Sequence, residues 1–185
     1  MRKLVAGLAI TLDSVVESPS QKQWLLYSDE MAEVIGTGIA KADAILLGRR
    51  TYLEFAELWP KQGSDSPMAD FMNNTAKYIV SSVLQPPLAW AHSSLVTGDL
   101  AEVVAKLKEQ PGKNIQIPGS PTLVRSLLRD GLLDELSLLV HPIVLGSGMR
   151  LFDEITDQVD LELVESRALR TGVLSVAYQP VNALR

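Results

Sequence analysis

Apolar and polar positions follow two different periods along the first two thirds of the chain. Apolar residues at spacings of three and four alternate with short continuous apolar runs, which are typical of buried strands between amphipathic helices. We expect strands over residues 3–10, 42–47, 77–81, 93–96 and 114–117. The helical stretches cover residues 29–40, 51–59, 68–73, 99–110 and 120–130. This alternation predicts β–α units that feed a mainly parallel sheet.

The last third of the chain has a different pattern. Three strand-like runs follow one another with no helical stretch between them, namely Glu135–Val144, Leu161–Ala168 and Val173–Gln179. Thr171 and Gly172 stand between the last two runs and suit a hairpin turn. We therefore expect antiparallel strands to complete the sheet, and a chain of the α/β class that forms one domain over residues 1–185.

Composition narrows the function. The chain has 185 residues, 46% of them hydrophobic, and a formal net charge of −5. This charge argues against a general binder of nucleic-acid backbones. No cysteine and only two histidines are present, so we expect no metal site and no thiol chemistry. The first apolar run is short and interrupted by Asp13, and we interpret it as a buried strand of a cytoplasmic protein with no membrane segment.

Three predicted strand ends carry residues suited to ligand binding. Ligands bind open α/β sheets at the carboxyl ends of strands, where helix N-termini offer free N–H groups. Gly48, Arg49 and Thr51 follow one strand, and Gly119–Thr122 follow another. Each group fits a phosphate contact, and each also fits an ordinary tight strand–helix turn. Gly146-Ser147-Gly148 forms the third group, for which a plain turn is the favoured interpretation.

Acid–base candidates are few. Asp13 follows the first strand, and Asp29 and Glu30 open the next helix. Acidic residues in a first helical turn are also explained by the helix dipole. His141 stands alone in a predicted strand, where a packed histidine with one satisfied nitrogen is the favoured interpretation.

Several of these motifs together resemble one family. Gly48-Arg49-Arg50-Thr51-Tyr52 is similar to the Gly-Arg-x-Thr motif of dihydrofolate reductases, and Lys77–Ser82 is similar to their next strand. Ile117-Pro118-Gly119-Ser120 stands where they carry a Gly-Gly pair. Over residues 1–180 the chain resembles bacterial dihydrofolate-reductase-like proteins related to the C-terminal reductase domain of the bifunctional riboflavin-biosynthesis deaminase-reductase. The stretch from His141 to Gly148, followed by Leu151-Phe152, is typical of them.

The resemblance implies a fold, a cofactor and a set of site residues. The fold would be a three-layer α/β/α sandwich with a mostly parallel sheet and antiparallel C-terminal strands. Gly48, Arg49 and Thr51 would bind the phosphates of NADPH. Ser81 and Ser82 would lie near the adenosine ribose and a 2′-phosphate. The pyrophosphate and the nicotinamide end would be held by Gly119, Ser120, Pro121 and Thr122.

The resemblance also implies a reaction, hydride transfer to a pterin-like or ribosylamino-pyrimidine-like small molecule. Asp29 and Glu30 are the nearest matches to the substrate-site acid of dihydrofolate reductases. Ser82 stands where an arginine would favour NADPH, so NADH is kept as an alternative cofactor. Relatives often read Leu-Asp-Gly where this chain has Leu12-Asp13-Ser14.

Two other functions stay open at this point. One is a non-catalytic protein that binds a nucleotide or a pterin on the same fold. The other is a structural role as a homodimer through the antiparallel C-terminal strands, whose apolar alternation could face a second subunit.

Overall fold

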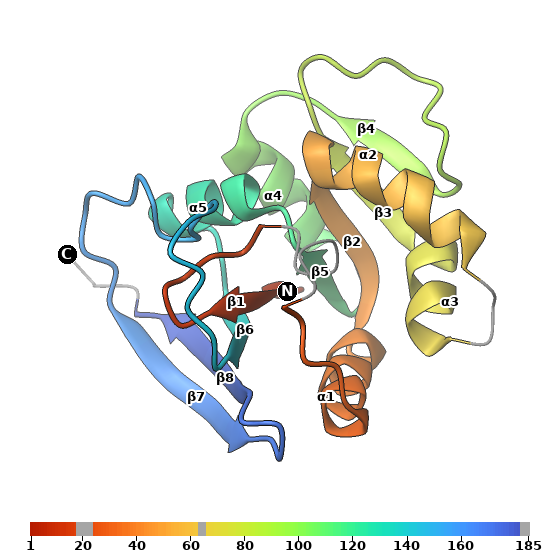
Figure 1. Cartoon of the computed structure of the whole chain (residues 1–185). Helices are drawn as coiled ribbons and strands as arrows, with labels where there is room; N and C mark the ends of the chain where they lie inside the picture. The colour runs from red at the N-terminus through yellow and green to blue at the C-terminus, as the bar shows by residue number, and fades with distance from the viewer. Residues whose placement is uncertain (18–23, 63–65, 182–185) are drawn as a thin grey trace.

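One eight-stranded mixed sheet organises the chain in the computed structural model, which describes residues 1–17, 24–62 and 66–181 (Figure 1). The strand order is β4-β3-β2-β5-β1-β6-β8-β7. The strands are β1 (Leu4–Thr11), β2 (Ala42–Gly48), β3 (Ala76–Val80), β4 (Ser93–Val96), β5 (Asn114–Pro118), β6 (Glu135–His141), β7 (Leu161–Ala168) and β8 (Leu174–Pro180). Strands β1 to β6 pair in parallel, and β8 pairs antiparallel with both β6 and β7. The predicted sheet, mostly parallel with antiparallel C-terminal strands, is confirmed.

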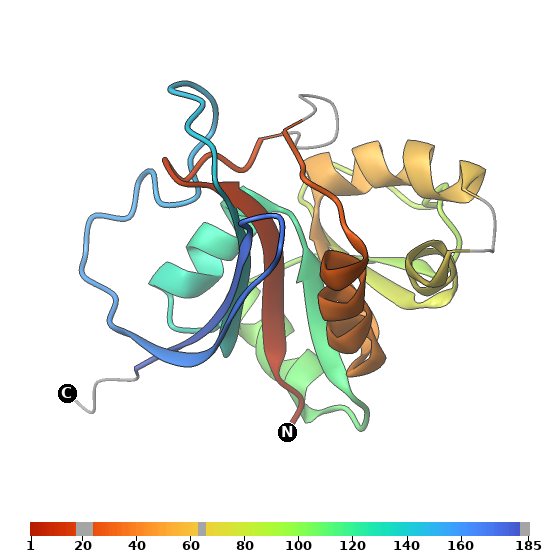
Figure 2. The same ribbon diagram turned by 60° about the horizontal axis from the view of Figure 1, so that its bottom comes forward.

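Helices cover both faces of this sheet, as Figure 2 shows. They are α1 (Asp29–Ala40), α2 (Arg49–Leu58), α3 (Pro67–Asn74), α4 (Leu100–Glu109) and α5 (Pro121–Arg129), with a 3-10 turn at Trp59–Lys61. Helices α4 and α5 pack on one face, where they bury the alternate residues Leu4, Ala6 and Leu8 of β1. Helices α1, α2 and α3 lie on the opposite face. The expected three-layer α/β/α architecture is confirmed.

Two predicted boundaries differ from the structure by more than one residue. Strand β6 ends at His141 and not at Val144, because Pro142 has no N–H to continue the ladder. Helix α2 begins at Arg49, directly after β2, and not at Thr51. The earlier start places Arg49 at the first helical position, which matters for the site.

Lys77 is a buried cation that the apolar pattern of β3 concealed. Its ammonium group donates to the carbonyl oxygens of Met72, Asn73 and Thr75 at 2.7–3.2 Å and lies 4.6 Å from the centre of the Trp90 ring. Burial lowers the pKa of Lys77 to about 8. These bonds satisfy carbonyl groups at the C-terminal end of α3, which a helix end leaves without partners.

Candidate functional site

The starts of helices α2 and α5 lie next to each other at the carboxyl edge of the sheet. Strands β2 and β5 are neighbours and run in parallel, so both helices leave the sheet at this edge. The backbone N–H of Gly48 donates to the hydroxyl of Ser120 at 3.0 Å, which ties the two strand ends together. The predicted site residues at 48–51 and 119–122 are therefore brought together.

Gly119 lets the two loops approach closely. Its φ of +88° favours glycine, and a Cβ atom at this position would lie 3.5 Å from the Cγ2 atom of Thr51. The Thr51 side chain is buried against this turn. Gly48 has no comparable constraint, because a Cβ atom there would meet only ordinary contacts at 3.7 Å or more.

Ser120 plays a different part from the one expected of a helix cap. Its backbone has a φ of 57°, and its side chain makes no capping bond to α5. The hydroxyl accepts the hydrogen bond from Gly48 instead, and the residue is only 4% exposed. Ser120 therefore shapes the junction, while Pro121 occupies the first helical turn.

Helices α2 and α5 differ from the other three in how they begin. Ser28, Ser66 and Asp99 cap α1, α3 and α4 through side-chain hydrogen bonds, and each of those helices has an acidic residue in its first turn. Helices α2 and α5 have neither feature. Their first N–H groups lack a capping side chain, and the partial positive charge of each helix start is not offset by a carboxylate.

Two arginines add charge to this position. Arg49 and Arg50 are exposed, and neither has a hydrogen bond or an ion pair from its side chain within the described residues. A cation at a helix N-terminus is unfavourable for the helix itself. The start of α2 is therefore arranged for an anion and not for helix stability.

Ser81 and Ser82 lie one strand further along the same edge. Val80, the last residue of β3, pairs in register with Gly48 at the end of β2. Ser81 and Ser82 follow Val80 directly, so they lie beside the start of α2. The hydroxyl of Ser81 accepts the N–H groups of Val83 and Leu84 at 3.2 and 3.1 Å, which closes its own turn. Ser82 is exposed. Thr122 is also exposed, and its hydroxyl accepts a bond from Arg125 at 3.4 Å.

The two acidic candidates lie elsewhere on this edge, at the start of α1 beside the β7–β8 turn. Glu30 accepts the backbone N–H of Arg170 at 2.8 Å and pairs with the guanidinium group of Arg170 at 3.3 Å. The backbone bond to Arg170, aided by that charge, lowers the pKa of Glu30. Asp29 is exposed, and both residues line a hollow of about 430 Å3 that also contains Thr171. No hydrogen bond or ion pair within the described residues joins the side chains of this pair to the Gly48–Ser120 junction.

Asp13 holds two loops together through hydrogen bonds and is not suited to donate a proton. Its carboxylate accepts the hydroxyl of Thr11 at 2.7 Å and the N–H groups of Leu145 and Gly146 at 3.2 and 2.8 Å. The Thr11 bond and these backbone bonds lower the pKa of Asp13 to about 2. Ser14 beside it has a φ of 62°, a conformation that favours glycine, the residue that the family resemblance leads us to expect there.

His141 is fully buried at the end of β6. Its Nδ1 atom accepts the backbone N–H of Leu26 at 3.3 Å, and its ring meets Trp24 edge-on at a centroid distance of 5.3 Å. Desolvation lowers the pKa of His141, and its Nε2 atom has no partner in the described structure. The expectation of a packed histidine with one satisfied nitrogen is confirmed.

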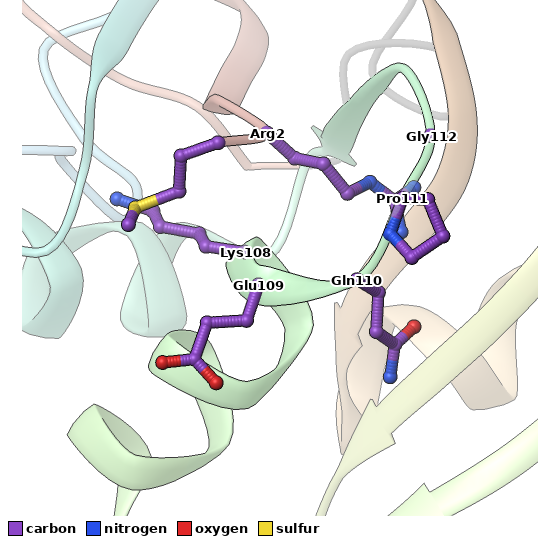
Figure 3. Close-up of a pocket in the computed structure, with 7 residues that line it drawn as sticks. Arg2, Lys108, Glu109, Gln110, Pro111 and Gly112 are labelled. Carbon is purple, nitrogen blue, oxygen red and sulfur yellow. The ribbon is translucent and has the colours of Figure 1, made fainter.

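A second hollow, of about 410 Å3, lies at the opposite edge of the sheet (Figure 3). Its two basic side chains are Arg2, two residues before β1, and Lys108, near the end of α4. Both are already paired, Arg2 with Asp43 and Lys108 with Asp134. These pairs hold the amino ends of the strands, so neither side chain is free for an anionic ligand.

No group of histidines and acidic residues suited to a metal ion occurs in the part of the chain that the structure describes. Over the same residues, no helix is long and apolar enough to cross a bilayer.

Comparison with known proteins places this geometry in a family. The chain is 27% identical over 181 residues to the uncharacterized protein YyaP of Bacillus subtilis (strain 168), covering 96% of this chain and 94% of that protein. Its fold is similar to a pyrimidine reductase-like protein from Corynebacterium diphtheriae, with a TM-score of 0.71, 14% identity and coverage of 98% and 92%.

The fold is also similar to that of dihydrofolate reductase from Enterococcus faecalis, solved with NADP(H), with a TM-score of 0.61, 14% identity and coverage of 97% of both chains. The model of the RibD C-terminal domain matches residues 2–175. The chain therefore belongs to the RibD C-terminal domain family, and the expected relation to riboflavin-biosynthesis reductases and dihydrofolate reductases is confirmed.

Proposed function

We propose that this protein is an NADPH-dependent reductase that reduces a pterin-like or ribosylamino-pyrimidine-like small molecule. The observation that carries the proposal is the paired start of α2 and α5. Among the five α-helices of the described residues, only these two begin without a capping side chain and without a carboxylate in the first turn, and they begin side by side. Two adjacent helix starts of this kind, with Arg49 at the first position, suit the phosphates of a dinucleotide.

Family membership supports a reductase. The related fold of dihydrofolate reductase was solved with NADP(H), which supports a nicotinamide cofactor on the same edge of the sheet. When bound, that cofactor would supply the hydride, and the protein would orient the reactants and exclude water.

Four of the predicted binding residues have a distinct part in this proposal. Arg49 holds a phosphate by its guanidinium group, and the free N–H groups of α2 and α5 complete the contact. Gly119 and Ser120 set the spacing between the two helices. Ser82 faces solvent one strand away, where the adenosine ribose would lie, and it carries no charge that requires a 2′-phosphate. NADH is therefore kept as a competing cofactor.

The acid of the reaction is assigned to α1 in this proposal. Glu30 is held ionised by Arg170, which makes it a poor proton donor. Asp29 makes no hydrogen bond or ion pair within the described residues and stands exposed beside it. Of the two predicted acids, Asp29 is the one with a carboxyl group free to contact a substrate.

A calorimetric titration with NADPH and with NADH tests the proposal. We expect Arg49→Ala to weaken NADPH binding by about 1.5–3 kcal/mol, the scale of one charge-assisted contact. Arg129→Ala is the matched control, since Arg129 lies at the far end of α5 and pairs with its neighbour Asp130. Equal NADPH affinity in wild type and Arg49→Ala would remove the site.

A non-catalytic nucleotide- or pterin-binding protein is the second candidate function. It is favoured by the ionised state of Asp13 and Glu30, whose lowered pKa values make them unsuited to donate a proton near neutral pH. Binding of NADPH with no oxidation of it across a panel of pterins and aminopyrimidines would favour this candidate over the reductase.

A further inference from the structure

The two central strands β1 and β5 are covered unequally on their two faces. On the α4–α5 side, Ala6 of β1 and Ile115 and Ile117 of β5 are completely buried. On the α1–α3 side, Gly7 and Ala9 of β1 remain partly exposed. Central strands of a sheet between two helical layers are normally buried on both faces. The α1–α3 face of β1 is therefore incompletely covered at Gly7 and Ala9.

The side chain of Gln116 in β5 lies on this same incompletely covered face, since its neighbours Ile115 and Ile117 are buried on the other. A Cβ atom at Gly7 would lie only 2.8 Å from the Nε2 atom of Gln116, closer than real Cβ atoms approach a neighbour. The side-chain amide of Gln116 thus lies across β1 at the one position where the side chain is missing. The backbone of Gly7 does not have a positive φ, so space and not conformation explains the glycine.

The amide of Gln116 has unused hydrogen-bonding capacity. It makes no hydrogen bond to any residue that the structure describes, and the residue is partly exposed. A primary amide offers two donors and one acceptor oxygen. Its position is close to the candidate cofactor loop, because the N–H of Gly119 donates to the carbonyl oxygen of Gly7 at 3.2 Å.

We propose that Gln116 is the specificity-determining residue for the substrate, and that it recognises a planar ring carrying a cyclic amide. This inference rests on the proposed reductase function, which places a cofactor at the neighbouring starts of α2 and α5. An amide side chain pairs with a cyclic amide through two hydrogen bonds, since each group presents an N–H beside a C=O. Gly7 and Ala9 have little or no side chain, so a flat ring can lie on the strand beside Gln116.

The test uses two ring compounds as probes and the full chain as the protein. Pteridine-2,4-dione carries cyclic amides, and its 1,3-dimethyl derivative has the same ring with both amide N–H groups blocked. Calorimetric titrations of wild type, Gln116→Leu and Gly7→Ala with each probe, in the presence of NADPH, give the dissociation constants. Gln62→Leu is the matched control, because Gln62 lies on the exposed surface after α2.

We expect Gln116→Leu to bind pteridine-2,4-dione about tenfold more weakly than wild type, the effect of losing two net hydrogen bonds. Gly7→Ala should also weaken binding, because its methyl group displaces the Gln116 amide without removing it. The dimethyl derivative keeps its carbonyl oxygens but has no amide N–H, so Gln116→Leu should weaken its binding less than it weakens that of pteridine-2,4-dione. Gln62→Leu should behave as wild type. Circular dichroism checks that each variant is folded.

Two results would overturn the inference: equal affinity of wild type and Gln116→Leu for pteridine-2,4-dione, or failure of wild type to bind it. The proposed function fails separately. If Arg49→Ala binds NADPH as wild type does while the Gln116 effect persists without NADPH, the cofactor site is wrong and the ring site stands. If Arg49→Ala loses NADPH but Gln116→Leu changes nothing, only the ring site is wrong.

Discussion

The single carboxylate of Asp13 joins the loop after β1 to the loop after β6. One of its oxygens accepts Thr11 and Leu145, and the other accepts Gly146. Because these donors favour the charged form, the pKa of Asp13 is about 2 in the folded protein against an ordinary value of 3.8. These bonds anchor the start of the Gly146-Ser147-Gly148 loop to Asp13.

This anchoring predicts a pH dependence of stability. Folding favours ionised Asp13, so its contribution is complete above about pH 4 and is lost as the pH falls toward 2. Asp13→Asn should remove the contribution, so wild type should lose more of its unfolding free energy than the variant between pH 4 and 2. Urea unfolding at a series of pH values measures this.

Asp29→Asn serves as the control for that experiment, because Asp29 makes no hydrogen bond or ion pair within the described residues. Its profile should match wild type. Parallel profiles for wild type and Asp13→Asn would show that Asp13 is not the anchor.

At this scale, the sequence predicted which residues lie together better than it predicted their contacts. Strand–helix junctions and the Gly-Arg-x-Thr pattern pointed to Arg49 and Gly119 as candidates, and the structure brings their two junctions together. That Ser120 bonds to Gly48 and not to its own helix depends on a left-handed backbone, which no local pattern indicates. The contact of Gln116 with Gly7 joins two strands far apart in the chain, so only their pairing reveals it.

Helix α1 contains two glycines that lower its stability. Gly36 and Gly38 lie in its second half, and a Cβ atom at either position would meet nothing within 4 Å. Glycine inside a helix lowers stability because the unfolded chain gains more freedom. Packing gives no reason for glycine at these positions.

Gly36→Ala should therefore raise the free energy of unfolding by about 0.5–1 kcal/mol. Gly119→Ala is the opposite case, since its φ of +88° strains any side chain and Thr51 lies 3.5 Å from the added atom, and it should be destabilising. Urea unfolding of both variants compares them. Loss of stability in Gly36→Ala would show that α1 needs the glycine.

Element types were predictable because the two hydrophobic periods are distinct along most of the chain. Element ends were less so. The apolar run through Val144 concealed the end of β6, which Pro142 determines by its missing N–H. Arg49 and Arg50 carry no apolar signal, so the first turn of α2 lay outside the predicted helix.

In the whole molecule, β7 forms one outer strand of the sheet and has no strand beyond it. Strand β7 is the last strand in the order, and Leu163 and Val164 within it are 51% and 53% exposed. Apolar edge strands left open tend to pair with another chain. We propose that two copies of the chain associate through β7, as the alternation of the C-terminal strands predicts.

Leu163→Lys should therefore shift the protein from dimer to monomer in sedimentation velocity. Leu53→Lys is the matched control, because Leu53 is 45% exposed on α2, away from β7, and should leave the dimer intact. A wild-type protein that sediments as a monomer would contradict the proposal.

Strand order is the feature of the whole molecule that periodicity alone could not predict. The insertion of β5 between β1 and β2 brings the junctions after β2 and β5 together, although β3, α4 and other elements separate them in the chain. The family resemblance supplied this arrangement, since it already assigned both junctions to one cofactor.

The most direct test of the central claim is amide hydrogen exchange of the full chain with and without NADPH. We predict slower exchange at the unpartnered first amides of α2, residues 49–51, and of α5, residues 122 and 123, when NADPH is bound. Protection confined to other segments, or no binding of NADPH or NADH, would contradict the claim that these paired helix starts hold the cofactor.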